Sequence, residues 1–129
     1  AERDPIAMGA TAAWLHHIGE VGPTPYEFCM DERRQTQRPD LVLRKRKIDA
    51  ADVTVVSGIP ATTPSRTVID LIDYGEDLSL IANVLNDALA RELVTDEARL
   101  KKEIDSRAAR VGLSKGSSLY ELMRRRHRP

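Results

Sequence analysis

The side chains of this chain that most readily bind metals or act as nucleophiles are three histidines and one cysteine. His16 and His17 are adjacent, so a regular helix points them to different faces and they cannot bind one metal ion together. We expect His17 to lie buried on the apolar side of that helix and His16 to be solvated. Cys29 could be a nucleophile only beside a histidine brought to it by the fold. We expect it instead to be an unreactive residue of a buried strand.

A second possible chemistry is metal-dependent cleavage of nucleic acid. Pro39-Asp40 precedes an apolar segment, as in the first half of a restriction-type nuclease motif. The second half would be Glu-x-Lys on a following strand, and no Glu-x-Lys occurs downstream. The sequence also has no HExxH, no GxSxG and no glycine-rich phosphate loop. We therefore predict a protein that is not an enzyme and has no catalytic residue, cofactor or metal site.

The segment SGIPATTPSRTVIDLI, residues 57–72, places an arginine and an aspartate one helical turn apart. Thr63 followed by Pro64 predicts a helix start, with the threonine as cap and the proline at the first helical position. Arg66 and Asp70 can then pair on the surface of that helix. No nucleophile or metal-ligand set accompanies them in the sequence. We interpret the segment as a strand-to-helix corner held by an Arg–Asp pair.

The elements that must position these residues follow the order helix, strands, helices. Apolar spacing predicts a first helix capped by Asp4. Strands are expected at residues 26–30, 41–47, 53–56 and 59–63. The last of them is expected at a sheet edge because it contains Pro60. From residue 64 onward, apolar stripes predict further helices, one of them capped by Thr95. The predicted fold class is α+β: a small mixed or antiparallel β-sheet preceded by one helix and followed by a C-terminal helical bundle of about four helices.

Charge is balanced in total, with a formal net charge of 0 at pH 7, but it is segregated along the chain. In LVLRKRK, residues 41–47, the apolar alternation stops after Leu43, so we expect this cationic end to project from the sheet. It either protects an edge strand or provides a docking surface for RNA, DNA or an acidic protein. No aromatic residue is interleaved with these cations, which argues against stacking on single-stranded nucleic acid. The candidate surface comprises Arg33, Arg34, Arg38, Arg44, Lys45, Arg46 and Lys47, with the C-terminal residues Arg124, Arg125 and Arg126.

The composition indicates one soluble globular domain. Of its 129 residues, 41% are hydrophobic and 31% are charged, which suits a single core in water. No signal segment and no apolar run of membrane-spanning length occurs, and a single cysteine fits a reducing compartment. We therefore expect a cytoplasmic protein that does not bind membranes. Because the chain begins with Ala1 rather than Met, we also expect a preceding domain in the natural protein.

Three segments of the chain resemble the AbiEi family of bacterial antitoxins. VTVVSGIPATTPSRTVIDLI, residues 53–72, is similar to the family's strand, Gly-Ile-Pro-x-Thr-x-Pro-x-Arg-Thr motif and apolar helix. RRQTQRPDLVLRKRKIDAADV is similar to its arginine-rich hairpin, and ATAAWLHHIGE to its opening helix. The resemblance covers roughly residues 6–95. The residues that match the central motif, which we interpret as structural, are Gly58, Pro60, Thr63, Pro64, Arg66, Thr67 and Asp70.

The resemblance implies that residues 1–129 form the C-terminal antitoxin domain of a type IV toxin–antitoxin system. Members of the family neutralise a nucleotidyltransferase-like toxin, and an N-terminal winged helix-turn-helix binds operator DNA as a transcriptional repressor. Operator DNA would then be a partner of the full-length protein through a domain absent from this chain. Two alternatives stay open: a stand-alone nucleic-acid-binding module that uses the basic hairpin and tail, and a nuclease-like enzyme. The oligomeric state also stays open.

Overall fold

The computed structural model describes residues 4–32 and 36–126, and its strands form one mixed sheet. The strands lie in the order β3-β2-β1-β5-β4. Antiparallel pairs join β1 to β2 and β4 to β5, and parallel pairs join β1 to β5 and β2 to β3. The bounds are β1 Ile6–Ala7, β2 Tyr26–Met30, β3 Leu41–Lys45, β4 Val53–Val56 and β5 Ile59–Thr62.

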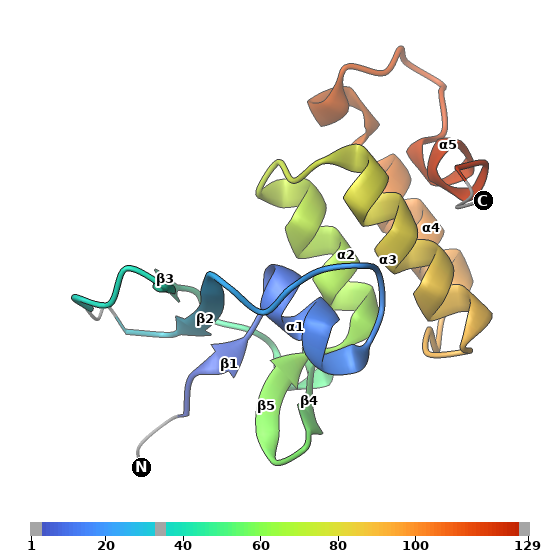
Figure 1. Ribbon diagram of the computed structural model, residues 1–129. Coiled ribbons are helices and arrows are strands. Elements are labelled where there is room, and N and C mark those ends of the chain that lie inside the picture. The colour runs from blue at the N-terminus through green and yellow to red at the C-terminus, as the bar shows by residue number, and fades with distance from the viewer. Residues whose placement is uncertain (1–3, 33–35, 127–129) are drawn as a thin grey trace.

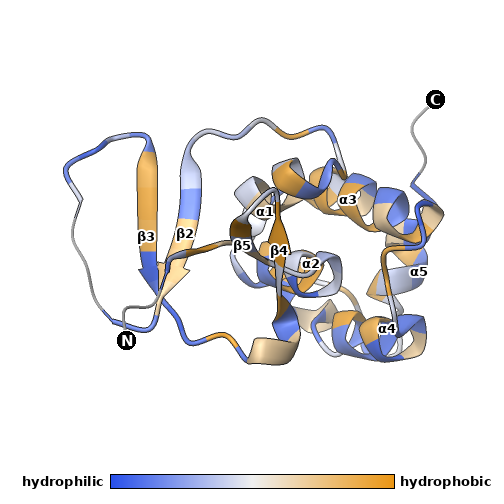
Figure 2. Ribbon diagram, turned by 90° about the horizontal axis from the view of Figure 1, so that it is seen from below, coloured by the Kyte–Doolittle hydropathy of each residue, from blue (hydrophilic) through white to orange (hydrophobic). Residues whose placement is uncertain are grey.

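One helix lies between the first two strands, and the other helices follow the last strand. In Figures 1 and 2, β2 and β3 lie at one end of the molecule and α3, α4 and α5 at the other, with α1 and α2 between them. The α+β class, with its mixed sheet and C-terminal helices, is confirmed. The bounds are α1 Gly9–His16, α2 Pro64–Asp73, α3 Leu78–Ala90, α4 Glu97–Asp105 and α5 Leu119–Arg124, with short 3-10 helices η1 Ala50–Asp52 and η2 Ala108–Val111.

The main core lies among the helices. Apolar residues spaced by three and four along α2 and α3 pack against α4 and α5 and are removed from water. This is the distribution that the sequence predicts for residues 64–124, because an amphipathic helix is stable in water only when its apolar stripe is covered. Its fully buried members include Val68, Ile81, Leu85, Leu100, Ile104, Leu119 and Met123.

The N-terminal segment differs from the prediction, because a strand stands where a helix was expected. Ile6–Ala7 form β1, and α1 begins only at Gly9, so Asp4 does not cap it. The first turn of α1 is capped by a side chain of β2: Ala10 N donates to the Glu27 carboxylate at 3.2 Å. Gly9 has φ +56°, and a Cβ there would lie 3.0 Å from the same carboxylate. A long-range cap of this kind leaves no signal in the local sequence.

Two strand predictions also need correction. β5 is not an edge strand, because it lies between β1 and β4. Pro60 is compatible with that place because the two-residue β1 pairs with β5 at Ala61 and not at Pro60. The arginine-rich segment is not a hairpin either. β2 and β3 run parallel, with Tyr26 beside Leu41 and Met30 beside Lys45.

Candidate functional site

The corner between β5 and α2 is built as its sequence predicts. Thr63 is the N-cap, and its Oγ1 accepts from Arg66 N at 3.3 Å, with Pro64 at the first turn. Arg66 Nε donates to Asp70 Oδ1 at 2.9 Å, which is the predicted pair one turn apart. Arg66 Nη1 also donates to Asp52 Oδ2 of η1 at 3.1 Å, a contact that the sequence did not reveal. Arg66 therefore joins the start of α2 to the segment before β4.

The inner end of this corner is a buried polar network. The Asp70 side chain is fully buried, and burial raises the pKa of its carboxyl group although Arg66 opposes that shift. Among the described residues, Asp70 Oδ2 has no hydrogen-bond partner. Thr67 Oγ1 donates to Thr63 O at 2.8 Å and shares a hydrogen bond of 2.7 Å with Thr62 Oγ1. These bonds tie α2 to β5 and explain why threonine, rather than an apolar residue, occupies buried positions here.

The cationic strand only partly projects, which corrects the expectation that both of its faces point outward. Arg44 stacks on the Tyr74 ring, with 4.0 Å between its guanidinium and the ring centroid, and its Nη2 contacts Glu27 at 3.5 Å. Arg46 Nη1 donates to the Tyr74 hydroxyl at 2.7 Å, and its Nη2 lies 3.8 Å from Asp70 Oδ1. The strand pleat continues past Leu43, so these two arginines face α2 while Lys45 points to solvent.

The structure does not gather the candidate cations on one surface. Arg38 is 62% exposed and pairs with Asp40 at 2.8 Å, which lowers the pKa of that carboxyl group. Lys47 is exposed, and Arg33 and Arg34 lie outside the described residues. The C-terminal cations lie on the helical end, away from β3 (Figures 1 and 2). There, Arg124 donates to Asn86, Arg126 donates to Ser79 at 2.9 Å, and Arg125 is exposed.

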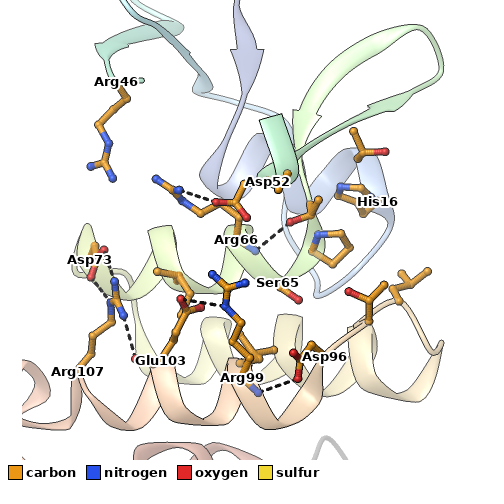
Figure 3. Close-up of a pocket in the computed structure, with 18 residues that line it drawn as sticks. His16, Arg46, Asp52, Ser65, Arg66, Asp73, Asp96, Arg99, Glu103 and Arg107 are labelled. Carbon is orange, nitrogen blue, oxygen red and sulfur yellow. Dashed lines mark hydrogen bonds and ion pairs between the residues drawn. The ribbon is translucent and has the colours of Figure 1, made fainter. Parts of the chain in front are cut away.

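A pocket of about 670 Å³ opens between the corner and α4, and Figure 3 shows charged side chains around it. Arginines from four segments line it together with carboxylates that pair with them. Arg107 Nε donates to Asp73 Oδ1 at 2.7 Å, and Arg99 Nε lies 3.8 Å from Glu103 Oε1. The sequence alone does not reveal this pocket, because its walls come from segments that are far apart along the chain. The charged lining residues are Arg46, Asp52, Arg66, Asp73, Asp96, Arg99, Glu103 and Arg107.

The histidines and the cysteine occupy positions that differ in part from the prediction. His17 is not a core residue: it is exposed and ends α1 in the left-handed conformation with φ 60°. His16 is not simply solvated, since its Nε2 lies 2.8 Å from Thr62 O and it lines the pocket. Cys29 is fully buried as expected, and burial, with the charge of Asp70 adding to it, raises the pKa of its thiol to about 11. At neutral pH this thiol is therefore protonated and a poor nucleophile.

Within the described ranges, no group of three or more His, Cys, Asp or Glu side chains is arranged to hold a metal ion. Asp40, the acidic residue of the possible nuclease motif, is held by Arg38 through two hydrogen bonds of 3.1 and 2.8 Å. The pocket presents about as many carboxylates as guanidinium groups, so it favours neither sign of ligand charge. In the part of the chain that the structure describes, the arginines and carboxylates of this region therefore form ion pairs with one another.

The comparison with protein families decides the kind of domain. The family model described as AbiEi antitoxin C-terminal domain matches residues 5–122. The chain belongs to this family. The AbiEi match includes β1, where the sequence predicted a helix, and extends over α1 to α4 into α5. No curated protein and no solved structure gives a significant match. The chain is thus an antitoxin domain of a toxin–antitoxin system, and none of its described helices is both long and apolar enough to cross a bilayer.

Proposed function

We propose that this AbiEi domain neutralises a nucleotidyltransferase-like toxin in a type IV toxin–antitoxin system of the bacterial cytoplasm. The full-length protein would add an N-terminal winged helix-turn-helix that binds operator DNA and represses transcription. The domain itself would act without catalysis. The observation that carries the proposal is the family match over residues 5–122. The exact system, the toxin and the repressor role follow from the resemblance of the GIPATTPSRT segment to that family.

The arrangement of charged residues supports action on another macromolecule. In the polar corner, Arg66 is bound to two carboxylates and Asp70 is fully buried, so the corner acts as scaffold. The exposed cations Arg38, Lys45 and Lys47 lie instead on the sheet end, where a large partner can reach them. Accessible charges act on large charged partners over a distance of about one Debye length, roughly 8 Å at physiological salt.

Growth rescue tests the proposal. The nucleotidyltransferase-like protein encoded beside the antitoxin is expressed from an inducible promoter, alone or with the full-length antitoxin. We expect growth arrest by the toxin and recovery with the antitoxin. A toxin variant without its catalytic carboxylate is the matched control and should arrest nothing. Failure of the full-length antitoxin to restore growth would overturn the proposal.

Two further measurements separate the parts of the proposed role. Co-purification of toxin and antitoxin distinguishes a stable complex from neutralisation without one. Binding of promoter DNA by the full-length protein, but not by residues 1–129, is expected if the repressor function lies in the preceding domain. Equal promoter binding by residues 1–129 would assign the operator contact to this domain instead.

A further inference from the structure

Another cavity is an open groove of about 540 Å³ on the sheet. Two rows of side chains from β2 and β3 form one wall of it. The parallel register places Tyr26 beside Leu41, Phe28 beside Leu43 and Met30 beside Lys45. Because side chains alternate along a strand, these six residues share one face of the sheet. We call them the outer face: Tyr26, Phe28, Met30, Leu41, Leu43 and Lys45.

The opposite face of the same two strands carries Glu27 and Arg44 beside Cys29 and Val42. Glu27 accepts from Ala10 at the start of α1, and Arg44 stacks on Tyr74 after α2. Glu27 is 9% exposed, whereas the aromatic and leucine side chains of the outer face are only half-buried. This is the reverse of the usual pattern, in which the apolar face of a sheet is the covered one. An apolar face left open to water is typical of a binding surface.

Two aromatic rings are the distinctive part of this face. Tyr26 and Phe28 are two residues apart on β2, which separates them by about 7 Å along the strand. Each is half-buried and lines the groove, so each ring is held in place while part of it stays accessible. Accessible rings on a sheet are surfaces on which unpaired bases stack, whatever the base.

A cation follows these rings on the same face of the sheet. Lys45 is on the outer face itself, beside Met30 and two residues beyond Leu43. Lys47 follows two residues later, past the end of β3, and both lysines are exposed. Figure 2 shows the apolar start of β3 changing to a hydrophilic end. Arg38, which lines the groove, is neutralised by Asp40, and Asp4 is the further acidic residue of the lining. The phosphate-binding charge of the face is therefore that of the two lysines.

We propose that the outer face binds a single strand of nucleic acid, with bases stacked on Tyr26 and Phe28 and phosphates next to Lys45 and Lys47. The site goes beyond toxin neutralisation and does not depend on it. The primary sequence argued against stacking because no aromatic residue lies within the cationic run. The parallel pairing of β2 with β3 places Tyr26 and Phe28 beside Leu41 and Leu43, directly before that run, so that Lys45 follows them on the same face. Aromatic rings complement a base and lysines complement its phosphate, whereas a purely apolar partner makes no use of the lysines.

Fluorescence anisotropy of labelled oligonucleotides with the purified 129-residue chain tests this site. The probes are a mixed-sequence RNA 12-mer, the DNA 12-mer of the same sequence, and the DNA duplex. We expect both single strands to bind more tightly than the duplex, whose bases are not available for stacking. Two lysine–phosphate contacts predict a slope of about −1.4 for log K against log salt concentration, at about −0.7 for each contact. Comparing the two single strands shows whether the ribose hydroxyl contributes.

Substitutions separate stacking from charge. Phe28→Leu keeps the apolar volume but removes the ring, and we expect binding about fivefold weaker or more with an unchanged salt slope. Lys45→Gln should reduce the slope by about 0.7 and leave the stacking contribution intact. Lys115→Gln, an exposed lysine in the connection before α5, is the matched control and should change neither quantity. Circular dichroism confirms that each variant is folded, and Tyr26→Leu replaces Phe28→Leu if the latter is not.

The proposal is overturned if neither single strand binds at about 25 mM salt, where electrostatic contacts are strongest. It is also overturned if the leucine variants bind as tightly as the wild type, since attraction would then be charge alone. A third result assigns the face to a second copy of the chain: light scattering shows a dimer that Leu43→Glu dissociates and Phe28→Leu does not. The growth assay is read independently, so neutralisation can fail while oligonucleotide binding holds, or the reverse.

Discussion

The two ends of this domain place their apolar residues in opposite ways. In the helical end, α2 to α5, the apolar stripes face one another, and Asp70 is the one charged residue of these described helices that is fully buried. At the sheet end, β2 and β3 turn Glu27 and Arg44 toward the helices and leave Phe28 and Leu43 on the open face. Periodicity identifies the two faces of an element equally well in both regions. It does not show which face the rest of the protein covers, and only the helical end follows the usual rule.

A polar junction holds the two ends together. Arg46, just after β3, bonds the Tyr74 hydroxyl and lies 3.8 Å from the buried Asp70. Asp70 in turn accepts from Arg66, which bonds Asp52 ahead of β4. This one carboxylate therefore faces cations from both regions. The contrast between an apolar helical core and a polar inner sheet face can be tested by changing residues on each side of the junction.

The largest effect is expected at the junction itself. Asp70→Ala removes the buried carboxylate and leaves Arg66 and Arg46 beside an apolar side chain, so the free energy of unfolding should fall by about 3 kcal/mol or more. Urea denaturation measures it. Asp40→Ala removes the exposed partner of Arg38 and is the matched control, with little expected change. Equal effects in both variants would mean that the junction does not join the two ends.

A pair of leucine truncations compares the two apolar faces directly. Leu85→Ala in α3 opens a cavity in the fully buried helical core and should cost about 3 kcal/mol of unfolding free energy. Leu43→Ala on the half-buried outer face should cost about 1 kcal/mol or less, because water already reaches it. Both are read from the same urea titration. A loss at Leu43 as large as that at Leu85 would show that the outer face belongs to the core.

Alkaline pH probes the helical end through Tyr120. The Tyr120 hydroxyl donates to Glu97 Oε2 at 2.5 Å, and burial together with Glu97 raises its pKa from 10.0 to about 12. The folded chain therefore holds this proton more tightly than the unfolded chain. The resulting stabilisation is complete below pH 10 and is lost as pH rises to about 12.

The test for this titration is the melting temperature of the wild type and Tyr120→Phe between pH 9 and pH 12, the range that runs from below the ordinary tyrosine pKa of 10.0 up to the raised pKa of about 12. We expect the wild type to lose more stability than the variant over this range, because phenylalanine has no proton to release. Parallel pH profiles would mean that the hydroxyl of Tyr120 ionises equally easily in the folded and unfolded chain.

The smallest effect is expected at the N-cap of α2. Thr63→Ala removes the acceptor for Arg66 N, and the unfolding free energy should fall by about 1 kcal/mol. Thr63→Ser keeps the hydroxyl and should restore most of the loss. A chemical denaturation curve for each variant gives the comparison. An alanine variant as stable as the wild type would show that Pro64 alone defines the start of the helix.

The sequence determined the features whose parts lie within a turn or two of one another. The Thr63 cap, the Arg66–Asp70 pair and the apolar stripes of α2 and α3 depend on local spacing, and the helix geometry of 3.6 residues per turn converts that spacing into contact. The GIPATTPSRT segment was recognised for the same reason, because its order of residues encodes the strand, turn and helix start.

Only the tertiary structure decided the features that join distant segments. Glu27 caps α1 from another strand, β1 pairs with β5, and the parallel register places Tyr26 and Phe28 along the cationic strand. The charged pocket forms in the same way, from residues of five or more elements. No local pattern encodes such contacts, because strand pairing is set by backbone hydrogen bonds that any residue except proline can make. Which partner a strand finds, and hence which of its faces stays open, is fixed when the whole chain packs.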